Sequence, residues 1–97
     1  MNTLYEYIEE QVLEYLNDVD VLDRFKYSIA LSNKIYNLLT PKQKCSLETF
    51  MQTECNGRII HNDFLSSEYI CLFDRTKSIN DPERVYQIWI PNHMINL

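Results

Sequence analysis

The sequence contains a single glycine, Gly57, among its 97 residues. Loops that cradle phosphate groups and the dinucleotide-binding fingerprint need several glycines at fixed spacings. This shortage therefore excludes nucleotide chemistry that is built on those motifs. The sequence also lacks an apolar run near the roughly 18 residues that a membrane-spanning helix needs, and its first residues are acidic where a signal peptide would be basic. We therefore expect a cytoplasmic chain without a membrane partner.

Paired cysteines are missing as well. Cys45, Cys55 and Cys71 are an odd set without a C-x-x-C motif, which is typical of free thiols in a reducing compartment. The two histidines have no neighbour at metal-ligand spacing, so the sequence predicts no metal site and no cofactor. His61 lies two residues before Asp63, which could orient its imidazole for acid–base catalysis. Because no nucleophile in a recognisable motif accompanies the pair, we expect no enzyme activity and rank a hydrolase last.

Positive charge is absent from the first 20 residues, which carry six acids and no Lys or Arg. Residues 21–45 are basic, with five Lys or Arg against one Asp, and residues 46–97 are acidic again, with seven acids against four bases. The net charge of −5 therefore hides a basic middle between two acidic ends. Such an asymmetry bears on binding partners rather than on fold.

Hydrophobic periodicity and turn signals predict three helices. They cover about residues 3–17, 20–39 and 41–55. In the first, Leu4, Ile8 and Val12 share one face, and Thr3 with Glu6 fits a capping box. The second carries two apolar stripes, which predicts a central helix that is buried on two sides. The third opens on a threonine and a proline, which is a favourable helix start.

Past Gly57 the pattern changes to β-branched and aromatic runs, which favour strands. We expect these strands at about residues 58–61, 68–73 and 84–90. The order of elements predicts an α+β fold, with three helices followed by a small antiparallel sheet of two or three strands. At this length the chain should form a single domain, residues 1–97.

Four acids recur at every fourth position of the first predicted helix: Glu6, Glu10, Glu14 and Asp18. On a helix they form a row that rises about 6 Å per step within one third of the circumference. Like charges at this spacing repel one another, and the helix dipole favours only Glu6, in the first turn. The row is either a solvated face or a surface that binds something basic. Because successive phosphates of a nucleic-acid strand lie a similar distance apart, a protein groove that binds phosphates would also fit this row.

Three further residues border the acidic row. Leu13 lies on the polar side among carboxylates, Tyr7 flanks the row, and Glu9 lies at its rim. An apolar side chain within a polar rim is typical of an interface hot spot. The predicted partner-binding residues are therefore Glu6, Tyr7, Glu9, Glu10, Leu13, Glu14 and Asp18.

The leading hypothesis is a small, acidic, non-enzymatic inhibitor that occupies a basic, nucleic-acid-binding surface of a protein partner, such as a nuclease or another nucleic-acid-handling enzyme. The composition is rich in Asn, Ile and Tyr, which is typical of AT-rich genomes such as those of many phages. Small size and acidity fit a phage anti-defence protein (anti-CRISPR or anti-restriction) or an immunity-type protein. The oligomeric state is open, and a homodimer is compatible with the sequence.

The alternative hypothesis is a winged helix-turn-helix regulator that binds DNA. Its contacts would come from Lys42, Gln43 and Lys44 at the start of the third predicted helix, and from Arg75 and Lys77 in the loop before the last strand. An isoelectric point of about 4.9 argues against direct binding of nucleic acid. In a third interpretation, these lysines pair with the acids of the first helix and add little stability.

Overall fold

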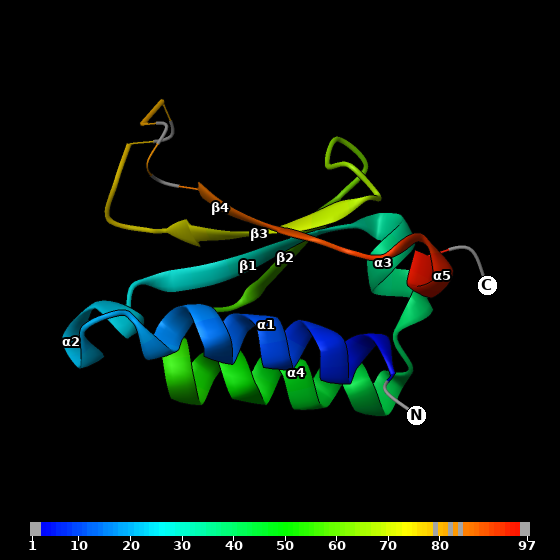
Figure 1. Ribbon diagram of the computed structural model, residues 1–97, viewed down its shortest axis with the longest axis horizontal. Helices are drawn as coiled ribbons and strands as arrows, with labels where there is room; N and C mark the ends of the chain where they lie inside the picture. The colour runs from blue at the N-terminus through cyan, green and yellow to red at the C-terminus, as the bar shows by residue number, and fades with distance from the viewer. Residues whose placement is uncertain (1–2, 79, 82, 84, 96–97) are drawn as a thin grey trace.

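The computed structural model describes residues 3–78, 80, 81, 83 and 85–95. It has two layers: a four-stranded sheet and, on one face of this sheet, two long helices that run side by side (Figure 1). In chain order, the elements are α1 (Leu4–Asn17), α2 (Val21–Arg24), β1 (Tyr27–Ser32), α3 (Asn33–Leu38), α4 (Pro41–Cys55), β2 (Ile59–Asn62), β3 (Tyr69–Asp74), β4 (Val85–Trp89) and α5 (Asn92–Ile95).

The strands lie in the order β2-β1-β3-β4. β1 pairs in parallel with β2, and the pairs β1–β3 and β3–β4 are antiparallel. Parallel pairing needs a crossover connection, and α3 and α4 form it between β1 and β2. The sheet is therefore mixed, and the prediction of a purely antiparallel sheet is wrong.

The predicted α+β class is confirmed, although the described residues contain five helices and four strands in place of three helices and two or three strands. The structure has α1 and α4 where helices were expected over residues 3–17 and 41–55. The three predicted strand ranges coincide with β2, β3 and β4 to within one residue at each end. Residue 84, the first of the last predicted strand, lies outside the described residues.

Residues 20–39 form no single helix, contrary to the prediction. They contain α2, β1 and α3. Along β1, Ile29 and Leu31 belong to the core, whereas Ser28 and Ala30 face the opposite side of the sheet and are also buried. A central strand that is buried on both sides carries two apolar stripes, and periodicity alone does not separate such a strand from a buried helix.

Capping groups fix the ends of the two long helices. Thr3 accepts a hydrogen bond from the N–H of Glu6, and the Glu6 carboxylate accepts one from the N–H of Thr3, both at 3.2 Å. Thr40 and Gln43 form the same capping box at the start of α4, at 3.1 and 3.0 Å. α4 ends at Asn56, which adopts the left-handed conformation with φ 47°. The predicted capping box of the first helix is thus present, and α4 has a matching one.

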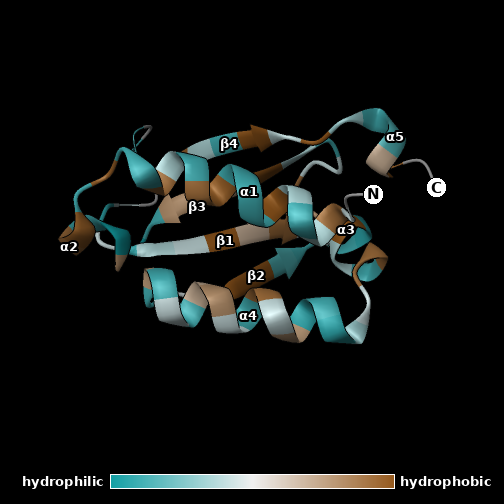
Figure 2. Ribbon diagram, turned by 60° about the horizontal axis from the view of Figure 1, so that its bottom comes forward, coloured by the Kyte–Doolittle hydropathy of each residue, from teal (hydrophilic) through white to brown (hydrophobic). Residues whose placement is uncertain are grey.

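The core fills the space between the sheet and the layer formed by α1 and α4. Figure 2 shows apolar and polar segments that alternate along α1. Fully buried side chains include Ile8 and Val12 of α1, Leu47 and Met51 of α4, Ile29 and Leu31 of β1, and Ile70 and Leu72 of β3. In the part of the chain that the structure describes, no helix covers the other face of the sheet (Figure 1). Because α1 packs on the sheet through its buried residues, its outer side is directed to solvent.

Candidate protein-binding surface

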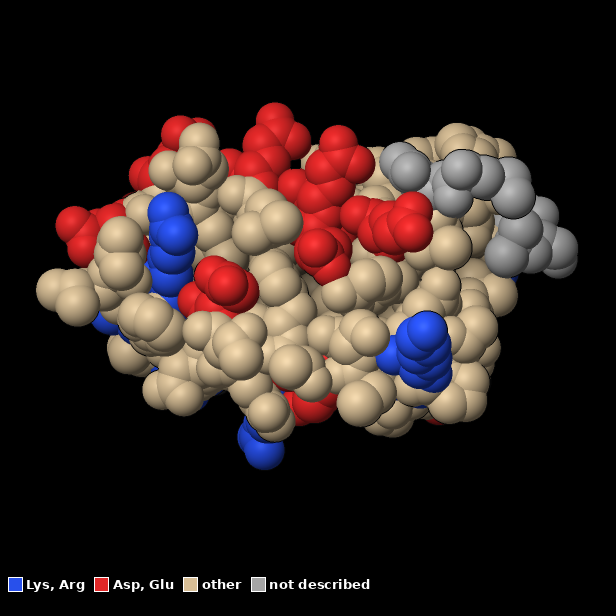
Figure 3. All heavy atoms as spheres, turned by 90° about the horizontal axis from the view of Figure 1, so that it is seen from below, with Lys and Arg blue, Asp and Glu red and all other residues tan. Residues whose placement is uncertain are grey.

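The outer side of α1 carries the acidic row. Because the buried residues of α1 face the sheet, the row of Glu6, Glu10, Glu14 and Asp18 is exposed along its whole length. Figure 3 views the molecule from the helix side and shows acidic side chains gathered along the part of this face that α1 occupies. The structure thus brings the four predicted acids onto one solvent-facing surface.

Within the described residues, none of these four acids forms an ion pair. The ion pairs there join Lys26 to Asp23 at 2.8 Å and Lys77 to Glu83 at 3.5 Å. Glu6 is engaged as a capping residue of α1. The interpretation in which neighbouring lysines neutralise the row therefore has no contact to support it. Among the described residues, Glu10, Glu14 and Asp18 thus have no ion-pair partner, although Arg24 shares the lining of one hollow with Glu10 and Glu14.

An open hollow of about 500 Å³ lies at the C-terminal half of the row. Its lining consists of Glu10, Leu13, Glu14, Leu16, Asn17, Arg24 and Glu54. Leu13 is 43% exposed, so an apolar wall and several carboxylates border the same concavity. The Nε atom of Arg24 is buried and has no hydrogen-bond partner among the described residues. Glu54 of α4 extends the acidic surface beyond α1, and sequence reasoning missed it because it lies 36 residues or more from the predicted acids.

Tyr7 and Glu9 make contacts within the protein. Tyr7 is half-buried, and its hydroxyl donates a hydrogen bond of 2.9 Å to the backbone carbonyl of Trp89 in β4. Glu9 is also half-buried and lies beside Tyr5. Burial raises the pKa of Tyr5 to about 12, with a further contribution from the Glu9 carboxylate. Tyr7 thus links α1 to β4, whereas the contact between Glu9 and Tyr5 lies within α1.

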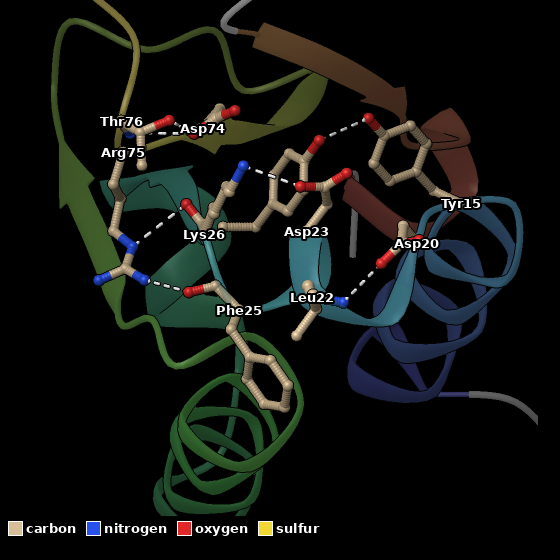
Figure 4. A network of polar contacts seen from close by, with 10 residues as sticks. Tyr15, Asp20, Leu22, Asp23, Phe25, Lys26, Asp74, Arg75 and Thr76 are labelled. Atoms are coloured by element: carbon tan, nitrogen blue, oxygen red, sulfur yellow. Dashed lines mark hydrogen bonds and ion pairs between the residues drawn. The ribbon is translucent and has the colours of Figure 1, made fainter.

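Sequence reasoning missed an exposed apolar group at α2. Val21, Leu22 and Phe25 are 60%, 78% and 43% exposed. In Figure 4, Leu22 and Phe25 point to the same side of the segment that carries them. Arg75, which directly follows β3, holds this segment by donating to the backbone carbonyl of Phe25. The sequence did contain a signal for this group, since three large apolar residues fall within five positions that follow Asp20 and include Asp23. They add apolar surface next to Arg24 and the hollow.

The five residues of the DNA-binding alternative do not form one surface. Gln43 is part of the capping box, and the Lys44 ammonium lies 4.4 Å from the centre of the Tyr36 ring. Arg75 donates to two backbone carbonyls, and Lys77 pairs with Glu83. Lys42 is exposed at the start of α4. In Figure 1, this end of α4 and the loop that contains Arg75 and Lys77 lie at opposite ends of the longest axis.

His61 and Asp63 contact each other only through Asn33. The Nδ1 atom of His61 lies 2.8 Å from the Asn33 side-chain oxygen, and the Asn33 amide donates to Asp63 at 2.7 Å. The imidazole also stacks on Tyr36, with ring centres 3.9 Å apart. Sequence reasoning missed Asn33, the first residue of α3, because the parallel pairing of β1 with β2 that brings it beside His61 and Asp63 was not predicted. The arrangement positions the imidazole but places the carboxylate against an amide.

The three cysteines are free thiols. Cys55 and Cys71 are buried, and burial raises the pKa of Cys55 to about 11 and also raises that of Cys71, whereas Cys45 is exposed. Among the described residues, no three His, Cys, Asp or Glu side chains gather closely enough to hold a metal ion. Over the same residues, no helix has the length and apolar character needed to cross a bilayer.

The chain matches no protein-family model, no curated protein and no solved structure. An assignment of function therefore depends on the geometry and charge of the surface formed by α1, α2 and the end of α4.

Proposed function

We propose that this protein is a small, non-enzymatic binding module whose acidic row docks on a basic surface of a partner protein. One observation carries the proposal: Glu10, Glu14 and Asp18 are exposed on one side of α1 and have no ion-pair partner among the described residues. Repulsion within such a row costs a few tenths of a kcal/mol per pair. If a partner protein neutralises these carboxylates when it binds, this cost is offset in the complex.

The charge of the row supplies steering, and the neighbouring apolar groups supply contact. Complementary charges accelerate encounter and fix orientation more than they add affinity. Affinity needs desolvated apolar contact at the centre of the interface, and Leu13 offers it at the wall of the hollow, with Leu22 and Phe25 exposed beyond Arg24. The partner surface that fits is basic and has a projecting side chain for the hollow.

The more specific form of the proposal is inhibition of a nucleic-acid-handling enzyme. A rise of about 6 Å between successive acids follows from helix geometry and is close to the spacing of backbone phosphates. A nuclease groove that binds phosphates would accept this row in their place. A phage anti-defence protein or an immunity-type protein would act in this way, by occupying the groove without any chemistry of its own.

Charge reversal on α1, with a control matched in charge, tests the proposal. The test variant carries Glu10→Lys, Glu14→Lys and Asp18→Lys, and it leaves Glu6 in place because that residue caps the helix. The control variant carries Glu48→Lys, Glu68→Lys and Glu83→Lys, so both variants have the same net charge. Affinity capture from a nuclease-treated lysate of the source organism at low salt, followed by mass spectrometry, compares them with the wild type.

We expect a basic protein that the wild type and the control variant retain and the test variant loses. Equal retention by all three proteins would contradict a role for the acidic row. Recovery of nucleic acid from an undigested lysate, and its loss on digestion, would instead support the DNA-binding alternative.

A further inference from the structure

β4 is an edge strand whose outer side is open. It pairs with β3, and the described part of the chain places no strand on its other side. Four of its five residues are exposed, whereas β2, at the opposite edge, has one exposed residue in four. Proteins normally protect an edge with charge, proline or a covering segment, because unpaired backbone groups pair readily with another chain. Residues 85–89 contain neither a charged residue nor a proline.

The register of β4 shows which backbone groups are open. The N–H of Ile90 donates to the carbonyl of Glu68 at 2.9 Å, which identifies a hydrogen-bonded pair of the antiparallel ladder. Hydrogen-bonded and non-hydrogen-bonded residue pairs alternate along such a ladder, and in the non-hydrogen-bonded pairs the backbone groups point away from the partner strand. Val85, Gln87 and Trp89 therefore direct their N–H and C=O groups outward, and of these the Trp89 carbonyl already accepts a hydrogen bond from the Tyr7 hydroxyl at 2.9 Å. These groups form a template for one more strand.

Apolar side chains accompany this open edge on both faces of the sheet. Val85 and Trp89, which are 43% and 61% exposed, lie on the face without helices, where Trp89 packs edge-on against Tyr69 at 5.3 Å. On the helix side, Tyr86 stacks on Tyr15 of α1 with ring centres 4.1 Å apart. A strand added at β4 would therefore gain apolar contacts as well as backbone hydrogen bonds.

α1 brings acidic side chains to the same edge. Tyr7 and Tyr15 of α1 touch β4, and helical spacing places Glu14 and Asp18 on the flank next to them. An added strand would lie about 4.8 Å beyond β4, so its helix-side residues would run past these two carboxylates. Cationic residues suit those positions. A second copy of the chain would instead bring its own α1 acids toward them, and like charges oppose that pairing.

We propose that β4 binds an extended, cationic segment of the protein partner as a fifth strand of the sheet. Its basic side chains contact Glu14 and Asp18 on the helix side, and its apolar side chains cover Val85 and Trp89 on the opposite face. This inference rests on the proposed function, since it takes the partner to be basic, and it specifies the form in which the partner presents its charge.

Trp89 provides the readout, because it is the only tryptophan of the chain and lies on the proposed site. The probe is an acetylated and amidated peptide of alternating Lys and Val, titrated into the full-length protein at low salt. We expect a saturable blue shift of the Trp89 emission as the indole loses contact with water. The matched peptide with Glu in place of Lys should give none.

Two N-methylated versions of the probe test for strand pairing. In an antiparallel strand the Val N–H groups face β4, and in a parallel strand the Lys N–H groups do so. Methylation of the residues that face β4 should therefore abolish the blue shift, while methylation of the others leaves it. A shift that survives both methylations, or its absence with every peptide at millimolar concentration, would overturn the proposal.

The protein variant Gln87→Pro blocks the edge without breaking the sheet, because the N–H that it removes points outward. It should lose the blue shift and retain the wild-type circular-dichroism spectrum. Gln87→Ser, which keeps the N–H, is the control and should bind the probe. A concentration-dependent dimer in sedimentation velocity that Gln87→Pro dissolves would overturn the proposal by making a second copy the occupant.

The two proposals fail in different ways. If the α1 charge-reversal variant loses partner capture but Gln87→Pro retains it, the acidic row binds the partner and the fifth strand is wrong. In the second case, the Gln87→Pro variant loses peptide binding, while a variant with Glu14→Lys and Asp18→Lys binds the peptide as the wild type does. The edge would then bind a strand, but the lysines of the peptide would not contribute to binding.

Discussion

At the scale of single residues, Asp74 at the end of β3 makes a pH-dependent contribution to stability. Burial acts to raise its pKa, but hydrogen bonds from the Thr76 hydroxyl at 2.7 Å and the Thr76 N–H at 2.9 Å outweigh burial (Figure 4). Lys26 and Lys77 act in the same direction, so the pKa of Asp74 lies below its ordinary value of 3.8. Asp74 thus favours the folded state in its charged form.

The consequence is a loss of stability on acidification. Because the folded-state pKa is lower than the unfolded-state pKa, the contribution is complete above about pH 4 and disappears as the pH falls through the folded-state pKa. Asp74→Asn should therefore be less stable than the wild type at pH 7, and the two should converge at the acidic end. Urea denaturation across this pH range measures the difference, and a constant difference would contradict the assignment.

At the scale of elements, the helices and strands that local sequence signals define were predicted, whereas β1, whose identity depends on burial and strand pairing, was not. α1 and α4 begin at capping boxes that the residues themselves encode, Thr3 with Glu6 and Thr40 with Gln43. β1 has no such signal, because a strand between two others is buried on both faces and its sequence does not alternate clearly between apolar and polar residues. Its identity as a strand depends on the residues of β2 and β3 that pair with it, which lie about 30 or more positions away.

One close contact shows how the ends of β1 and α4 are coupled. A Cβ atom on Gly57 would lie 1.8 Å from the backbone carbonyl oxygen of Tyr27, so only glycine lets the chain that leaves α4 pass this close to β1. The single glycine of the sequence therefore marks the point where the crossover rejoins the sheet. The left-handed residue that ends α4 is its neighbour Asn56.

The capping box of α4 should carry measurable stability. Thr40→Ala removes the oxygen that accepts from the N–H of Gln43, and we expect the free energy of unfolding to fall by about 1 kcal/mol. Thr49→Ala, at an exposed position within the same helix, is the control and should be neutral or slightly stabilising. Urea denaturation of both variants tests this prediction. Equal losses in the two would mean that the cap contributes nothing specific.

At the scale of the whole molecule, the sequence defined the acidic row but not its surroundings. The spacing of Glu10, Glu14 and Asp18 already placed them on one side of a helix. The hollow beside them needs Glu54 and Arg24 from other elements, and the open edge at β4 needs a strand order that no local pattern encodes. The parts of the surface that come from one helix were therefore predictable, and the parts that come from its neighbours were not.

If the acidic row exists for a partner, removing its charge should stabilise the isolated protein. The variant with Glu10→Gln, Glu14→Gln and Asp18→Asn ends the like-charge repulsion among these positions and removes anions from the C-terminal half of the helix, where the dipole disfavours them. We expect it to be more stable than the wild type by about 1 kcal/mol at low salt, and the gain should shrink in 1 M salt because exposed charges are screened.

A scattered variant with Glu48→Gln, Glu68→Gln and Glu83→Gln has the same net charge and separates a local effect from a global one, since the exposed Lys77–Glu83 pair that it breaks adds little stability. Thermal melts of both variants at low and high salt make the comparison. A gain confined to the α1 variant, together with the loss of partner capture by the charge-reversal variant, would show that these carboxylates reduce the stability of the fold for the sake of binding. A less stable α1 variant would mean that the acids serve the fold itself, and the case for a partner at this surface would then lose its main physical reason.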